Sequence, residues 1–106
     1  MIKVNIYKKK KQIEEVVIKG HAGYDRSGFD IVCASVSSMV ITTVNAIIRY
    51  RNDSIEYEEK DGFVSIKIIN HDEVVDLLMI NLLDLLEKLE KQYQKYVKLN
   101  KEVSSC

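Results

Sequence analysis

Alternating apolar and polar residues open the chain and predict a pair of β-strands. Over residues 2–8, aliphatic side chains alternate with polar ones, which is the two-residue period of a strand with one buried face. Residues 13–19 predict a second strand, and the run Lys8–Lys11 between the two predicts an exposed, charged hairpin turn. Gly20 then ends the second strand pattern.

A twenty-residue apolar segment follows a glycine-containing loop and predicts a helix over residues 31–50. The segment is rich in β-branched residues, but strands seldom exceed about ten residues, so its length favours a helix. Asp30, directly before it, is a favourable N-cap residue. Serine, threonine and asparagine interrupt the segment and argue against a membrane span. Its apolar residues also recur at helical spacing, at Val32, Val36, Val40, Val44 and Ile47.

The second half of the chain repeats the order of two strands and one helix. Residues 54–59 and 63–69 alternate in polarity, and the dipeptide Asp61-Gly62 between them predicts a hairpin. From Asp72 to Val97, apolar residues step by three and four and predict a long helix, with residues 99–106 as a frayed tail. The order ββαββα predicts an α+β fold with two helices packed on one face of a small, mainly antiparallel sheet.

Composition and charge indicate one compact intracellular domain. The 106 residues are 46% hydrophobic and 30% charged, the balance of a folded globular chain. Lys+Arg and Asp+Glu both number 16, so outside the local lysine run the charge argues against a nucleic-acid partner. The N-terminal sequence lacks the apolar core of an export signal, and two cysteines without framework spacing are typical of a reducing compartment. We therefore expect a cytoplasmic protein with no direct contact to nucleic acid or membrane.

The predicted last helix carries more leucine than one face of a sheet requires. A second apolar surface on this helix would indicate a homodimer contact. A core stripe that is merely wide would produce the same pattern. The sequence leaves both explanations open.

Residues 20–38 carry the candidate chemistry. If Asp30 caps the helix, Cys33 falls in the first turn, where unpaired N–H groups and the helix dipole favour a thiolate. His21 begins the preceding loop and is a candidate general base for that thiol. Asp30 either orients the imidazole or only caps the helix, and Ser37 lies one turn beyond Cys33 on the same face. A nucleophile with its base is one explanation of this pattern, and a small packed cysteine is the other.

The loop before the helix adds candidate substrate-binding residues. Gly28 permits hinge motion, and Tyr24 and Arg26, with Asp25 between them, would form the polar lining of a lid. A zinc site built from the two histidines and two cysteines is disfavoured, because the chain has no C-x-x-C or H-x-x-H pair. The chemistry of a thiol with an imidazole needs no metal and no cofactor.

The string G-H-A at 20–22 followed by G-x-D-I-V-C-A-x-x-S at 28–37 resembles the ribosomal-processing cysteine proteases called Prp. The resemblance implies a single protease domain over residues 1–98, with Cys33 as nucleophile and His21 as general base. Asp30 and Ser37 match the aspartate and serine of the motif. It also implies a homodimer without a cofactor that removes the N-terminal extension of the large-subunit ribosomal protein L-twenty-seven after a pair of aromatic residues.

Two functions from other classes remain open beside proteolysis. A non-catalytic ribosome-assembly factor would bind the same ribosomal protein, or ribosomal RNA, through Lys8–Lys11. A thiol redox sensor would pair Cys33 with Cys106 under oxidation.

Overall fold

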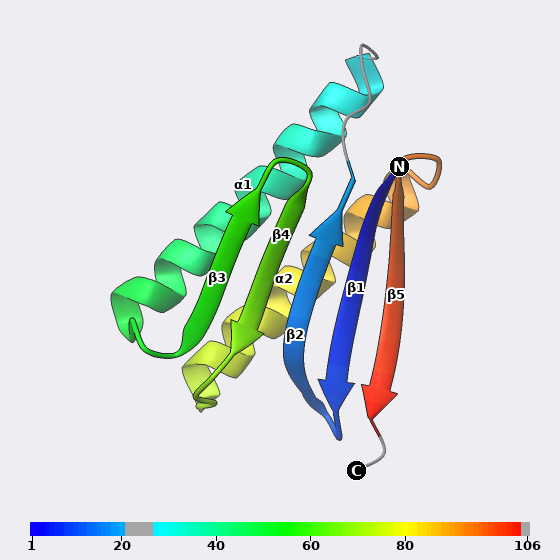
Figure 1. Ribbon diagram of the computed structural model, residues 1–106. Coiled ribbons are helices and arrows are strands. Elements are labelled where there is room, and N and C mark those ends of the chain that lie inside the picture. Colours follow the sequence, from blue (N-terminus) through cyan, green and yellow to red (C-terminus); the bar gives the residue numbers. More distant parts are fainter. Residues whose placement is uncertain (21–26, 105–106) are drawn as a thin grey trace.

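The computed structural model describes the backbone at residues 1–20 and 27–104, and the side chains at 1–20 and 31–102. Both helices cover the same face of a single five-stranded sheet, and the described chain leaves the other face open (Figure 1). The α+β class and the ββαββα order are therefore confirmed, with a fifth strand added at the C-terminal end. The elements are β1 (Ile2–Lys9), β2 (Gln12–Lys19), α1 (Ser27–Tyr50), β3 (Ile55–Lys60), β4 (Phe63–Ile68), α2 (Glu73–Gln92) and β5 (Val97–Ser104).

The sheet has the strand order β3-β4-β2-β1-β5. Strand β2 pairs antiparallel with both β1 and β4, and β3 pairs antiparallel with β4. Strand β5 pairs parallel with β1 over the whole length of both strands. The sheet is thus mixed but mainly antiparallel, with β3 and β5 as its two edge strands.

The predicted long last helix and frayed tail are wrong in their boundaries. Helix α2 begins after Asp72, whose side chain accepts a hydrogen bond from the Val75 N–H at 2.9 Å, as a capping residue does. The helix ends at Gln92, and Val97, only 1% exposed, begins strand β5. The residues from Val97 onward alternate in polarity like a strand, and they satisfy the backbone groups along the free edge of β1. Pairing with a strand far away in the sequence therefore orders the segment that local sequence leaves undecided.

Helix α1 packs on the sheet through the valines at helical spacing that the sequence predicted. Val32, Val40 and Val44 are buried against side chains of the sheet and α2. The part from Ile31 to Tyr50 has the length and mean hydropathy, 2.0, of a helix able to cross a membrane. In this fold one stripe of it is buried in the core, while Ile31, Ile41 and Ile48 on the same helix remain exposed.

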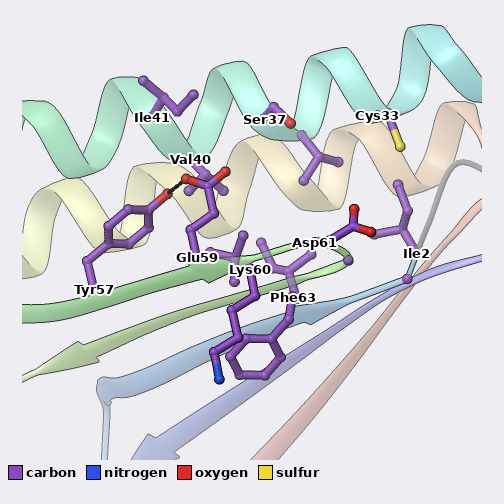
Figure 2. A pocket seen from close by; sticks show the side chains of 15 residues that line it. Ile2, Cys33, Ser37, Val40, Ile41, Tyr57, Glu59, Lys60, Asp61 and Phe63 are labelled. Carbon is purple, nitrogen blue, oxygen red and sulfur yellow. Dashed lines mark hydrogen bonds between the residues drawn. The ribbon is translucent and has the colours of Figure 1, made fainter.

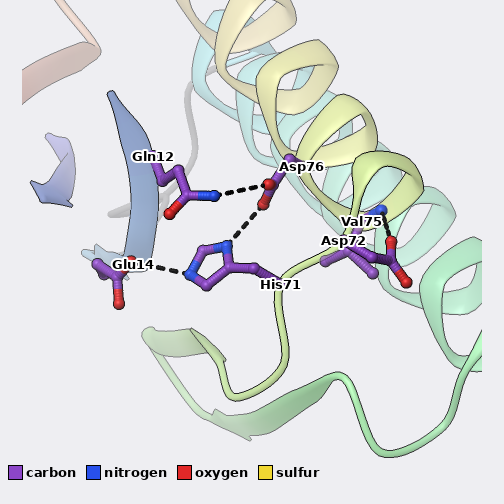
Figure 3. A network of polar contacts seen from close by, with 6 residues as sticks. All are labelled: Gln12, Glu14, His71, Asp72, Val75 and Asp76. Carbon is purple, nitrogen blue, oxygen red and sulfur yellow. Dashed lines mark hydrogen bonds and ion pairs between the residues drawn. The ribbon is translucent and has the colours of Figure 1, made fainter. Parts of the chain in front are cut away.

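A polar cluster joins β2 to the start of α2, at the end of the molecule opposite to the start of α1 (Figures 1 and 3). The register of β1 and β2 shifts between Tyr7 and Lys8, which leaves Glu14 as an extra residue in β2. His71 bridges two carboxylates there: its Nε2 lies 2.8 Å from Glu14 Oε2 and its Nδ1 lies 2.7 Å from Asp76 Oδ1.

The stability of the fold should depend on the charge of His71. Partial burial opposes protonation, but the hydrogen bonds and negative charges of Asp76 and Glu14 outweigh it and raise the pKa of His71. A pKa raised by folding stabilises the protein below the unfolded value of about 6.5, and this contribution disappears as the pH rises through the folded value. We expect His71→Gln to lower the free energy of unfolding by about 1 kcal/mol at pH 6 and by less at pH 8.5. Urea denaturation at the two pH values measures this difference, and an equal loss at both would contradict the charged bridge.

Candidate active site

A pocket of about 270 Å³ opens between α1 and the β3–β4 hairpin. One wall is a single face of α1, because residues spaced by three and four lie on one side of a helix. The opposite wall combines the hairpin with the ends of β1 and β2, through Ile2, Ile18 and Gly20. Figure 2 shows that the pocket extends along α1, with Cys33 at one end and Tyr57 at the other. The residues of the helical wall are Cys33, Val36, Ser37, Val40 and Ile41.

Cys33 is half-buried and lies on α1 between the core and the pocket. The prediction that it falls in the first helical turn is wrong, because α1 begins at Ser27 and Cys33 is its seventh residue. Asp30 accordingly lies inside the first turn and not at the N-cap. Acidic residues are favoured at both positions, so an aspartate does not by itself show at which residue the helix begins. Because helical side chains lean toward the N-terminus, the Cys33 side chain covers the end of the first turn of α1.

The structure brings together some of the residues predicted for the site. Ser37 is exposed and lines the same pocket as Cys33, and Gly28 lies in the first turn of α1. Gly20, which precedes His21 in the chain, also lines this pocket, and its N–H donates to the Gly62 carbonyl oxygen at 3.0 Å. The other predicted positions lie outside the described residues: His21, Tyr24, Asp25, Arg26, Cys106 and the side chain of Asp30.

Sequence reasoning missed the hairpin wall of the pocket. Tyr57 and Glu59 project from β3 toward α1, and the Tyr57 hydroxyl donates to Glu59 Oε1 at 3.1 Å (Figure 2). Burial, this hydrogen bond and the Glu59 charge raise the pKa of Tyr57, so the phenol keeps its proton at neutral pH. The sequence held one signal: Glu59 occupies a position at which the alternation of β3 requires an inward-facing residue.

The composition of the pocket suits an extended peptide with apolar side chains. Val36, Val40 and Ile41 provide an apolar surface, and the hairpin adds the carboxylates of Glu59 and Asp61 to the lining. A thiol at one end of such a groove is positioned to attack a carbonyl of a bound chain. Among residues 1–20 and 31–102, no three His, Cys, Asp or Glu side chains are grouped as a metal site.

Comparison with known proteins agrees with this chemistry. Residues 1–98 match the family described as cysteine protease Prp. A ribosomal processing cysteine protease Prp from Staphylococcus aureus strain Mu50 is 33% identical over 76 residues, which cover 68% of this chain and 72% of the relative.

Solved structures of the S. aureus protease superpose closely on this fold. The complex of Prp with a substrate peptide has a TM-score of 0.88 at 27% identity, covering 96% of this chain and 100% of the relative. The complex with a covalently linked product peptide has a TM-score of 0.87 at 28% identity, with the same coverage. The fold of the relative therefore binds a peptide and becomes covalently joined to its product.

Proposed function

Because the chain belongs to the Prp family of ribosomal-processing cysteine proteases, we propose that it removes the N-terminal extension of the ribosomal protein L-twenty-seven. The single observation that carries this proposal is the position of Cys33 at one end of an elongated pocket whose walls are mostly apolar. Such a pocket accommodates the aromatic side chains that precede the proposed cleavage site. The S. aureus relative, solved with a substrate peptide, supports peptide binding by this fold.

In the proposed reaction, His21 takes the proton of the Cys33 thiol, and the thiolate attacks the scissile carbonyl carbon. A C–S bond forms as the carbonyl π electrons move to the oxygen. The tetrahedral oxyanion is stabilised by unpaired N–H groups at the start of α1. Collapse breaks the C–N bond, and His21 gives its proton to the departing amine of the mature ribosomal protein. His21 then takes a proton from water, and the resulting hydroxide hydrolyses the thioester and returns the thiolate.

The precursor of L-twenty-seven from the same genome is the substrate that tests this proposal. We expect one cut, with product masses that correspond to the extension and to the mature protein. Variants His21→Ala and Asp30→Asn are measured beside the wild type. Asp30→Asn keeps a polar oxygen and removes the charge, so a large loss of turnover with unchanged melting temperature would assign it an orienting role. An intact precursor in the presence of folded wild-type protein would exclude this substrate.

Ser37 provides a test of where the peptide lies. It is exposed on the pocket wall one helical turn from Cys33. We expect Ser37→Phe to raise KM for the precursor and lower kcat/KM about 30-fold by filling the groove, whereas Ser37→Ala changes it less than about 10-fold. Steady-state kinetics of both variants separate obstruction from the loss of a hydroxyl. A Ser37→Phe enzyme with normal kinetics would place the substrate elsewhere.

We also propose a cytoplasmic homodimer that forms through the outer surface of α2. Leu77 and Ile80 on that helix are 64% and 54% exposed, although the inner stripe of the same helix is buried in the core. Apolar side chains at this spacing form one exposed surface, which an isologous contact between two copies would cover. Light scattering should show a dimer for the wild type and a monomer for Leu77→Glu with Ile80→Glu. Lys88→Glu, an exposed substitution on the same helix, should remain dimeric; a monomeric wild type would reject the proposal.

A further inference from the structure

A row of lysines crosses the open face of the sheet. The strand register places Lys98 of β5 beside Lys3 of β1, and Lys3 beside Lys19 of β2. The row continues with Phe63 on β4, paired with Lys19, and ends with Lys60 on β3, paired with Phe63. The neighbours of Lys3 in β1 are buried on the helix side, so the row lies on the uncovered face (Figure 1).

Edge protection and ion pairing do not account for this row. Lysines on edge strands hinder aggregation, which is a sufficient reason for Lys98 and Lys60. Lys3 and Lys19 belong to interior strands, where like charges placed directly opposite each other are destabilising. Among the described residues, Lys60 pairs with Glu58 at 3.1 Å, whereas Lys3, Lys19 and Lys98 have no carboxylate partner.

Charge is unevenly distributed along this face, although the formal net charge of the chain is zero. Four residues farther along the strands, the register aligns a second row that is acidic on balance: it holds three carboxylates and one ammonium, in the order Glu102, Tyr7, Glu15, Lys67 and Glu56. Four residues span roughly 13 Å, which exceeds the screening length of about 8 Å at physiological salt. The lysine row therefore presents a local positive potential although the formal charge of the chain is zero.

We propose that this face binds single-stranded RNA, with the lysines contacting phosphates and Phe63 stacking on a base. The row is about 19 Å long, because it spans four gaps between strands. Cationic side chains flanking a half-buried aromatic ring are the combination that proteins use to bind single strands. An acidic peptide would use the positive charge but would leave the ring without a role. The proposal stands independently of the peptide substrate, although Lys60 and Phe63 also border the pocket next to Cys33.

Fluorescence anisotropy with a labelled mixed-sequence 12-nucleotide RNA tests the row. We expect the triple variant Lys3→Glu, Lys19→Glu and Lys98→Glu to bind at least about 10-fold more weakly and to lower the slope of log affinity against log salt by about two. The matched control Lys9→Glu, Lys10→Glu and Lys11→Glu makes the same change of net charge in the exposed first hairpin and should leave binding within about 3-fold. Equal losses in both triple variants, or no loss in the first, would overturn the proposal.

Two further measurements separate RNA binding from a structural role of these residues. Lys3→Glu should raise the melting temperature, because it places a carboxylate between Lys98 and Lys19, while it weakens RNA binding. Phe63→Leu should weaken binding to the RNA about 10-fold without changing the salt slope. The proposal would be contradicted if poly-glutamate or duplex RNA bound as tightly as the single strand. A single-stranded DNA of the same sequence shows whether the 2′-hydroxyl contributes to binding. Cleavage of the precursor is measured for the same variants, so that an effect on proteolysis is distinguished from an effect on RNA binding.

Discussion

Replacing Cys33 with alanine is expected to lower kcat/KM for the precursor by at least about a thousandfold. The substitution removes the only protein atom that bonds to the substrate carbon in the proposed mechanism, and binding in the groove cannot replace that step. The groove itself should persist, since Cys33 is half-buried and its neighbours Val32 and Val36 provide most of the core contact at this point. The variant should therefore still bind the uncut precursor.

Cys33→Ser is the closest control for this result. It preserves size and polarity but replaces the thiol with a hydroxyl whose pKa is far above neutral, so it should be nearly as inactive as the alanine variant. Unchanged urea midpoints for both variants would show that the loss is chemical. Residual turnover within about 10-fold of the wild type in either variant would mean that another group attacks the substrate.

Gly20→Ala is expected to destabilise the protein by about 2–4 kcal/mol, a large effect for the addition of one methyl group. Gly20 has φ +124°, a conformation that residues with a side chain rarely adopt, and an added Cβ would lie 2.3 Å from the Met1 carbonyl oxygen. The obstacle is backbone, not a flexible side chain, so the start of β1 would have to move. Because Gly20 lines the pocket and precedes His21, catalysis should also fall at temperatures where the variant is folded.

Urea denaturation gives the free energy of unfolding of Gly20→Ala and of Gly62→Asn. The comparison shows whether the loss of stability is specific to the position of Gly20. Gly62 has φ 71° at the tip of the β3–β4 hairpin, a left-handed conformation that asparagine tolerates. We expect Gly62→Asn to lose less than about 1 kcal/mol. A Gly20→Ala protein as stable as the wild type would mean that the approach of Gly20 to the backbone at the start of β1 is not constrained as described.

The parts of the fold that the sequence predicts well are those with strong local signals. The valine spacing of α1, the start of α2 near Asp72 and the Asp61-Gly62 turn each depend on residues close together in the chain. The start of α1 was missed because the aspartate preference is similar at the cap and in the first turn. Strand β5 was missed because it is stabilised by pairing with β1, more than eighty residues away.

The candidate site was predictable only in part for the same reason. Cys33 and Ser37 share a helix, so their spacing alone places them on one face. Tyr57 and Glu59 join them across the pocket because β3 lies at the edge of the sheet beneath α1, an arrangement set by strand order. The lysine row likewise could not be predicted from the sequence, because its members become neighbours only through the register of five strands.

The central claim is that Cys33 attacks a peptide bound in the groove along α1, and covalent labelling tests it most directly. A peptide that ends at the proposed cleavage site and carries an electrophilic ketone in place of the scissile carbonyl is incubated with the protein, and the modified residue is mapped by tandem mass spectrometry. We predict one label, on Cys33, that forms more slowly when uncut precursor occupies the groove and at least about tenfold more slowly in His21→Ala. Labelling of Cys106 in place of Cys33, or labelling of Cys33 that the precursor does not slow, would contradict the account.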